Sequence, residues 1–213
     1  MTRDAVALLP DGRTALLLTR AAQPCTGETV LVEAAAGGVG SLLVQLARLA
    51  GARTVGAVGS ASKMDIVSGL GADLVVDYST PDWTQRVAAL GGVNVVFDGV
   101  GGQIASTAFD LLRPGGRFVP FGMASGAFAT VTEAVANARA VTVVQSGRPS
   151  AEALRQLTEA ALAEAVAGRL HPLIGQIVPL AQAAHAHAAM ERRATVGKTL
   201  LAIALDTSHP NPS

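Results

Sequence analysis

The hydrophobic positions of the chain fall into two patterns that follow one another. Thr29, Val30, Leu31 and Val32 form a short apolar, β-branched run, which is typical of a strand buried on both faces. From residue 41 onward the apolar residues recur every three or four positions, which marks one face of a helix. The glycine-rich stretch between the two patterns therefore predicts a strand, a tight turn and a helix in immediate succession.

The same change of period repeats along the chain. Strands are expected at residues 29–32, 53–58, 74–77, 93–98, 117–121 and 141–144, with helices from residue 41 and at 61–70, 81–90, 103–112 and 132–138. Alternation at this spacing requires right-handed crossovers and a parallel sheet covered by helices on both faces. The sequence thus predicts an α/β fold with a doubly wound parallel sheet of six strands, the Rossmann dinucleotide-binding fold.

The chain divides into four parts on this pattern. Residues 1–27 are expected to be a helical lead-in of two short helices joined by a turn at Pro10, Asp11 and Gly12, and residues 28–147 the Rossmann domain. Residues 148–205 hold a helix at 150–168, a strand at 174–178, a helix at 180–193 and a strand at 199–204. Residues 206–213, rich in proline and polar groups, are expected to be a disordered tail.

The glycine-rich stretch carries the first candidate chemistry. Ala35, Ala36, Gly37, Gly38, Val39 and Gly40 form the fingerprint G-x-G-x-x-G with alanine in the first glycine place. Without Cβ atoms the backbone can approach a pyrophosphate, whose charge the N-terminus of the following helix stabilises. The alternative is a tight turn that holds no ligand.

The end of the second predicted strand indicates which dinucleotide is bound. A carboxylate there would accept a hydrogen bond from the 2′-hydroxyl of NAD and repel a 2′-phosphate. The chain has no acid at this place and offers Gly59, Ser60 and Lys63, one of only two lysines against fourteen arginines. The pattern predicts NADPH rather than NADH, and it argues against an S-adenosylmethionine-dependent methyltransferase, which usually carries an acid there.

The composition of the chain further limits the partners and sites that can be expected. Lysine plus arginine equals aspartate plus glutamate, at 16 each, so no basic field favours nucleic acid. A single cysteine, Cys25, and four histidines without a recognisable ligand pattern predict no metal site. Neither a signal peptide nor a membrane-spanning run is apparent, so a soluble cytoplasmic protein is expected.

Six motifs in order resemble the zinc-independent quinone oxidoreductases of the medium-chain dehydrogenase/reductase superfamily. They are GETVLVEAAAGGVGSLLVQLARLAGA, GSASK, GADLVVDY, VVFDGVGG, LLRPGGRFVPFGMASG and ERRATVGKTLL. The resemblance implies that Lys63 and Tyr78, with Ser60 beside them, bind the 2′-phosphate and that residues 37–40 bind the pyrophosphate. It also implies a nicotinamide floor of Val100, Phe121 and Gly122, a nearby hydroxyl from Thr14, and two cations at the edge of the cofactor, Arg193 and Lys198.

The resemblance also defines what this sequence does not contain. Members of that family begin with a β-rich, GroES-like catalytic domain, and this sequence begins where that domain would end. Residues 174–204 resemble the part that returns to complete it. The first hypothesis is hydride transfer from NADPH to a quinone or other conjugated carbonyl, with no catalytic side chain assigned. The alternative is an NADPH-binding module or partner subunit without reductase activity. A repurposed scaffold has no positive support, and a truncated product is a further alternative that the sequence leaves open.

The expected sixth strand bears on assembly. Val141, Thr142, Val143 and Val144 carry no charge and are β-branched throughout, which favours pairing between sheet edges. Members of the family that the sequence resembles commonly dimerise through such edges, so a symmetric homodimer is expected. The alternative is an edge covered by the helix that follows Ser150.

Overall fold

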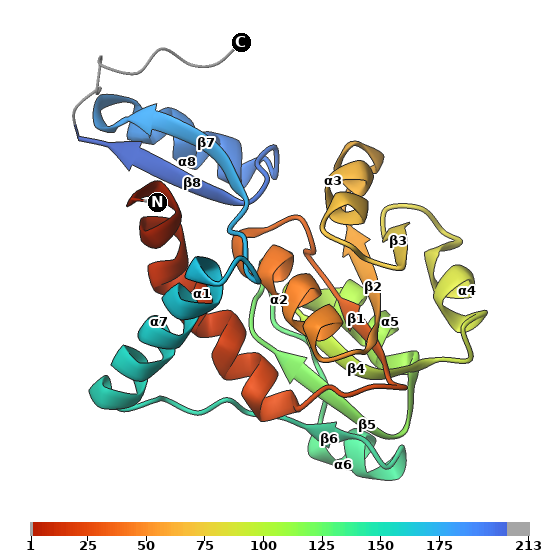
Figure 1. Ribbon diagram of the computed structural model, residues 1–213. Coiled ribbons are helices and arrows are strands. Elements are labelled where there is room, and N and C mark those ends of the chain that lie inside the picture. Colours follow the sequence, from red (N-terminus) through yellow and green to blue (C-terminus); the bar gives the residue numbers. More distant parts are fainter. Residues whose placement is uncertain (1, 204–213) are drawn as a thin grey trace.

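A six-stranded parallel sheet forms the centre of the computed structural model, which describes residues 2–203 (Figure 1). The strand order is β3-β2-β1-β4-β5-β6, the doubly wound arrangement that the sequence predicted. The strands are β1 (Thr29–Val32), β2 (Arg53–Val58), β3 (Leu74–Asp77), β4 (Val93–Asp98), β5 (Leu112–Pro120) and β6 (Thr142–Val143).

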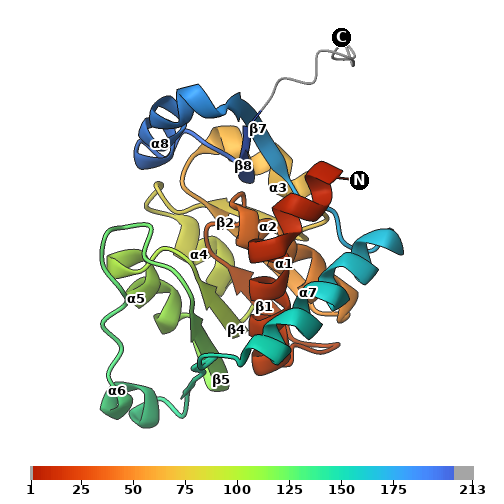
Figure 2. The same cartoon turned by 90° about the vertical axis from the view of Figure 1, so that its left-hand side faces the viewer.

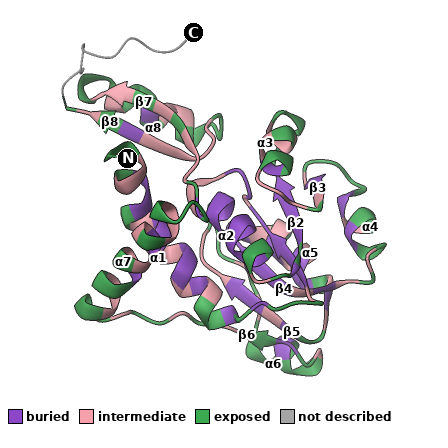
Figure 3. Ribbon diagram, in the orientation of Figure 1, coloured by how far each residue is buried: buried purple, intermediate pink, exposed green. Residues whose placement is uncertain are grey.

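Helices cover both faces of this sheet (Figures 1 and 2). They are α1 (Thr2–Ala22), α2 (Gly38–Leu49), α3 (Met64–Gly69), α4 (Trp83–Ala88), α5 (Gly102–Asp110), α6 (Glu133–Ala138) and α7 (Ala151–Val166). Within β1, Val30 and Val32 pack into the core shared with α1, α2 and α7, whereas Leu31 packs into the core shared with α4 and α5. This alternation buries both faces of β1 completely, which explains its unbroken apolar sequence (Figure 3).

The first helix corrects one sequence prediction. Residues 2–22 form the single helix α1, with Pro10 inside it, rather than two helices joined by a turn. Pro10 removes one backbone donor, but the buried stripe that includes Leu8, Gly12 and Ala15 continues in phase through this position. Packing against α2 and α7 therefore outweighs the local turn signal.

Strand β5 is the second difference. It was predicted at residues 117–121, whereas it spans Leu112–Pro120 and includes the proline and glycines that were expected to stop the preceding helix. Its pairing with β4 shifts register between Val93 and Val95, which accommodates the irregular stretch. Strand β6 is shorter than predicted, with two residues instead of four.

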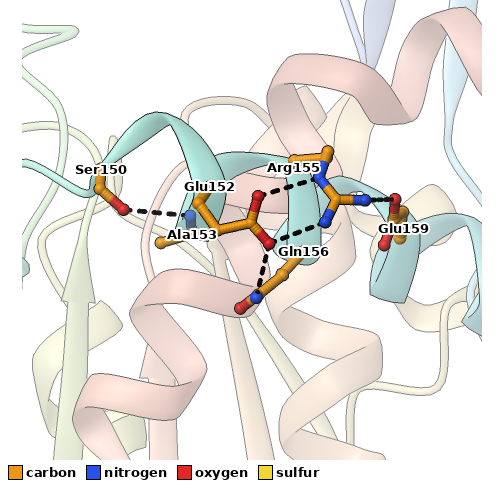
Figure 4. A network of polar contacts seen from close by, with 6 residues as sticks. All are labelled: Ser150, Glu152, Ala153, Arg155, Gln156 and Glu159. Carbon is orange, nitrogen blue, oxygen red and sulfur yellow. Dashed lines mark hydrogen bonds and ion pairs between the residues drawn. The ribbon is translucent and has the colours of Figure 1, made fainter.

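Helix α7 begins at a polar cap (Figure 4). The Ser150 hydroxyl accepts a hydrogen bond from the Ala153 backbone N–H at 3.2 Å and so caps the first turn of the helix. Arg155 then bridges Glu152 and Glu159 along the exposed side of the helix. Such exposed pairs contribute little to stability, so contact with α1 fixes the position of α7.

The last part of the chain forms a small unit outside the central sheet and contacts its glycine turn. Strands β7 (Ile174–Pro179) and β8 (Lys198–Ala202) form a separate two-stranded parallel sheet, with the short 3₁₀ turn η2 (Leu180–Gln182) and helix α8 (Ala183–Glu191) between them. The chain entering β8 lies against the glycine turn, because Gly197 N–H donates to Ala36 O at 2.6 Å. The predicted tail, residues 206–213, lies outside the described residues. Within residues 2–203, no helix is both long and apolar enough to cross a membrane.

Because α1 and α7 are in close contact, replacing Gly12 by alanine is expected to destabilise the protein, although alanine favours a helix more than glycine does. A Cβ added at Gly12 would lie 2.9 Å from Cβ of Ala161 and 3.0 Å from Leu8 Cδ2. Gly12→Ala should lower the free energy of unfolding by about 1–2 kcal/mol in urea denaturation, because overpacking outweighs the gain in helix propensity.

Gly69→Ala is the matched control. Gly69 is also helical, and an added Cβ would meet no atom within 4 Å. This variant should be more stable than the wild type by about 0.5 kcal/mol. Equal effects of the two substitutions would show that α1 and α7 are not in close contact.

Candidate nucleotide-binding site

The glycine turn is built from close backbone contacts. Ala34 adopts a left-handed conformation (φ 48°), and its carbonyl accepts a hydrogen bond from Gly37 N–H at 2.8 Å. A Cβ on Gly40 would lie 2.2 Å from that carbonyl oxygen, so glycine is needed there to let α2 start directly above the turn. Only the Ala34 carbonyl, at 3.1 Å, would lie near a Cβ on Gly37.

Gly38 has a different reason to be glycine. A Cβ at this position would lie 2.0 Å from Oδ2 of Asp11, a buried residue of α1. The glycine therefore makes room for a side chain of the protein itself, rather than for a ligand alone. Asp11 thus lies beside the first residue of α2.

Two adjoining cavities lie over the turn, at the carboxyl ends of the strands. The larger one has a volume of about 320 Å³ and contains Gly37, Gly38, Val39, Gly40, Phe121 and Lys198 among its lining residues. The smaller one, of about 170 Å³, contains Gly37, Gly59, Lys63, Tyr78 and Arg193. Most residues proposed for the cofactor therefore lie around one continuous cleft, since Gly37 borders both cavities.

Residues 193–198 pass over this cleft as one wall of both cavities. At one end Lys63 Nζ donates to Arg193 O at 2.8 Å, and the Arg193 guanidinium donates to Ala124 O at 2.6 Å. At the other end Lys198 Nζ pairs with Asp11 Oδ1 at 3.0 Å. Both lysines of the chain thus lie at the cleft, one at each end.

Two cations lie together in the smaller cavity without a lining carboxylate. Burial and the neighbouring Arg193 charge both lower the pKa of Lys63. Tyr78 closes the same end: its hydroxyl would lie 2.8 Å from a Cβ on Gly59, and burial raises its pKa. Unmatched positive charge beside a tyrosine hydroxyl is the arrangement that a phosphate group requires.

Four proposed residues do not line these two cavities. The Ser60 hydroxyl bonds to the Ser62 hydroxyl at 3.0 Å, and the Thr14 hydroxyl donates to Pro10 O within α1. Val100 is fully buried. Gly122 packs against Gly99, where a Cβ would lie 2.6 Å from the Gly99 carbonyl oxygen.

Two acidic side chains that the sequence reading missed lie buried at the ends of β1 and β4. Asp98 Oδ1 accepts hydrogen bonds from Val100 N–H at 3.0 Å and Gly101 N–H at 2.7 Å. Its other oxygen and both oxygens of Glu33 have no hydrogen-bond partner within the described residues. Burial, and then the facing Asp98 carboxyl, raise the pKa of Glu33 to about 10. Glu33 is therefore protonated at neutral pH, so the two buried carboxyl groups do not carry two like charges.

Asp11, Glu33 and Asp98 had only weak sequence signals. Asp11 stood in an apparent turn, while Glu33 and Asp98 are single charges at the ends of apolar strands. A charge in such a place is buried only if the fold supplies a partner. For Asp11 and Glu33 the facing groups, Lys198 and Asp98, are distant in sequence. Among residues 2–203, no cluster of three or more histidine, cysteine, aspartate and glutamate side chains is arranged to hold a metal ion.

The fold and the turn define an α/β domain of the doubly wound class with a dinucleotide-type glycine turn. Residues 38–163 match the family described as zinc-binding dehydrogenase. A probable quinone oxidoreductase from Schizosaccharomyces pombe is 38% identical over 210 residues, covering 92% of this chain and 62% of the relative.

Solved structures agree with this relationship. A mycobacterial protein complexed with NADPH superposes with a TM-score of 0.82 and 34% identity, covering 92% of this chain and 62% of that one. The quinone oxidoreductase from Thermus thermophilus, also solved with NADPH, gives a TM-score of 0.80 and 31% identity, covering 94% of this chain and 66% of that one. The chain belongs to the medium-chain dehydrogenase/reductase superfamily, in its quinone oxidoreductase family, and spans about three fifths of the length of the curated relative.

The protonated state of Glu33 predicts a pH dependence of stability. The folded chain keeps this proton up to about pH 10, whereas the unfolded chain releases it near pH 4.5, so the free energy of unfolding falls as pH rises between these values. Glu33→Gln keeps a neutral donor and removes this dependence. Between pH 6 and pH 8 the variant should gain about 3 kcal/mol relative to the wild type in chemical denaturation, since each pH unit is worth about 1.4 kcal/mol per proton.

Glu159→Gln, which removes an exposed carboxylate on α7, is the control and should follow the wild type at each pH. Parallel stability curves for wild type and Glu33→Gln would mean that Glu33 is ionised in the folded protein.

Proposed function

We propose that this chain binds NADPH and acts as an oxidoreductase that transfers hydride to a quinone or another conjugated carbonyl. The observation that carries the proposal is the pair of cations, Lys63 and Arg193, in a cavity whose lining contains no carboxylate. A relative named as a probable quinone oxidoreductase and structural neighbours solved with NADPH support the same reading.

The residues of the cleft fit the parts of this cofactor. The pyrophosphate would lie over the turn at residues 37–40, where the N-terminus of α2 favours negative charge. Lys63, Arg193 and Tyr78, with Ser60 close by, would hold the 2′-phosphate. Phe121 would border the nicotinamide end, with Val100 and Gly122 behind it and Thr14 near it on α1. The bound cofactor supplies the hydride.

In this chemistry the protein would position the nicotinamide and the hydride acceptor relative to each other. Phe121 and the strand ends would orient the nicotinamide, and residues 193–198 would restrict water over the cleft. Proximity of the two reactants supplies the rate enhancement, without an assigned side-chain acid or base.

A second candidate function is an NADPH-binding module that works with a separate chain. It is favoured by the small β7–β8 sheet, where Ile177 and Leu201 are partly exposed, together with the share of the relative that this chain does not span. An apolar sheet of this kind offers a surface to a partner. NADPH consumption with a panel of quinones and enones separates the two: turnover by this chain alone supports the reductase, and tight binding without turnover supports the module.

The remaining expectations concern setting and assembly. We propose a cytoplasmic location, and a symmetric homodimer formed through the β6 edge, with no nucleic-acid or membrane partner. Strand β6 pairs with β5 at the edge of the sheet, beside a hollow of about 400 Å³ lined by residues such as Val131, Val141 and Val143. Helix α7 packs on α1, away from this edge (Figure 1).

The cation pair predicts a change of cofactor preference. Lys63→Ala should weaken NADPH binding by about ten- to a hundredfold, the worth of one charge-assisted hydrogen bond, and leave NADH binding unchanged. Titration calorimetry with both dinucleotides measures this. Arg53→Ala, an exposed cation at the start of β2, should change neither affinity. Equal affinities of the wild type for NADPH and NADH would overturn the assignment of the 2′-phosphate site.

The proposed dimer predicts a sensitivity to charge at the sheet edge. Thr142→Lys places a charge on the exposed edge residue of β6, so light scattering at micromolar concentration should show a monomer in place of a dimer. Gln85→Lys, on exposed helix α4, should leave the dimer intact. A monomeric wild type would contradict the assembly.

A further inference from the structure

The two cavities of the cleft differ in charge. Asp11 and Lys198 are the charged residues lining the larger cavity at the glycine turn, and they pair at 3.0 Å. Lys63 and Arg193 line the smaller cavity, which no carboxylate lines. The described lining groups therefore give no net charge at the pyrophosphate end and two positive charges at the other.

The Asp11 carboxylate is fixed in this place. Its side chain is 12% exposed, and α1, from which it projects, packs on both α2 and α7. Oδ1 bonds to Lys198, while Oδ2 lies against Gly38, in the space that a Cβ would fill. A phosphate arriving at the turn would thus meet this carboxylate beside the lysine that attracts it.

We propose that Asp11 sets the affinity of the glycine turn for dinucleotides: it cancels the charge of Lys198 there, so that tight binding depends on the 2′-phosphate end of the cleft. The proposal rests on the function proposed above. A residue that acts on a group shared by all candidates changes their affinities by one factor and leaves the ratio of these affinities unchanged. Pyrophosphate is common to NADH and NADPH, whereas the 2′-phosphate distinguishes them.

The two ends of the cleft then contribute in different ways. Asp11 lowers the affinities for NADPH and NADH by the same factor, because both carry the same pyrophosphate. Lys63 and Arg193 set the ratio of the two affinities. With Asp11 in place, NADH binds weakly, and the contacts to the 2′-phosphate raise the affinity for NADPH above the affinity for NADH.

Charge alone predicts the order of dinucleotide affinities for four proteins: the wild type, Asp11→Asn, Lys198→Met and the double variant. Asp11→Asn leaves Lys198 uncompensated, and one unit of unpaired charge at the turn should tighten binding by about tenfold. Lys198→Met leaves Asp11 unopposed and should weaken binding by a similar factor. The double variant carries no charge at this end, as in the wild type, and should return to within about threefold of wild-type affinity.

The experiment is titration calorimetry of these four proteins with NADPH and with NADH, at two salt concentrations. The expected order of affinity is Asp11→Asn, then wild type and double variant together, then Lys198→Met, with the same factors for both dinucleotides. Binding by Asp11→Asn should also show the steepest loss with salt. Asp82→Asn, an exposed acid before α4, is the control and should bind as the wild type does.

Other outcomes overturn the proposal. If Asp11→Asn binds more weakly than the wild type while its thermal unfolding is unchanged, Asp11 positions Lys198 and does not offset it. If the double variant fails to recover, the effect is structural rather than electrostatic. Failure of all four folded proteins to bind either dinucleotide would instead refute the proposed function, and it is recognised by the wild-type titration alone.

Discussion

The candidate site depends on one backbone constraint, the close approach of three chain segments at the glycine turn. Gly40 lets α2 start on the Ala34 carbonyl, Gly38 admits the Asp11 carboxylate from α1, and Ala36 accepts a hydrogen bond from Gly197. A side chain larger than hydrogen at either glycine would separate these segments. The cavities and the charges that line them exist because this turn is free of Cβ atoms where the segments meet.

Much of the fold was predictable because the apolar pattern of each strand directly reflects burial on two faces. β1, β2, β3 and β4 begin and end where the sequence placed them, and their order is that of the predicted Rossmann fold. Prediction failed where tertiary contact outweighed a local signal. Pro10 and Gly12 read as a turn but lie in a helix held by its neighbours, and the proline and glycines before Arg117 read as a stop but lie in a strand.

The cleft likewise contains residues whose positions could be predicted from the sequence and residues whose positions could not. Gly37 and Lys63 could be placed at the cleft from spacing, because a fingerprint and a strand end fix their positions in this fold. Asp11 and Glu33 could not, since the group that each of them faces is brought near by folding. A buried acid is informative only once its neighbour is known, and no local pattern in the chain names that neighbour.

The pairing of Asp11 with Lys198 also bears on how the protein is made. These residues are separated by 187 positions, almost the whole chain, so their contact closes a very long loop and has a high contact order. On a ribosome, the sheet can assemble before Lys198 emerges, but the wall over the glycine turn cannot. Completion of the cleft therefore follows assembly of the sheet, and an emerging chain exposes its glycine turn to the surrounding solution until β8 docks.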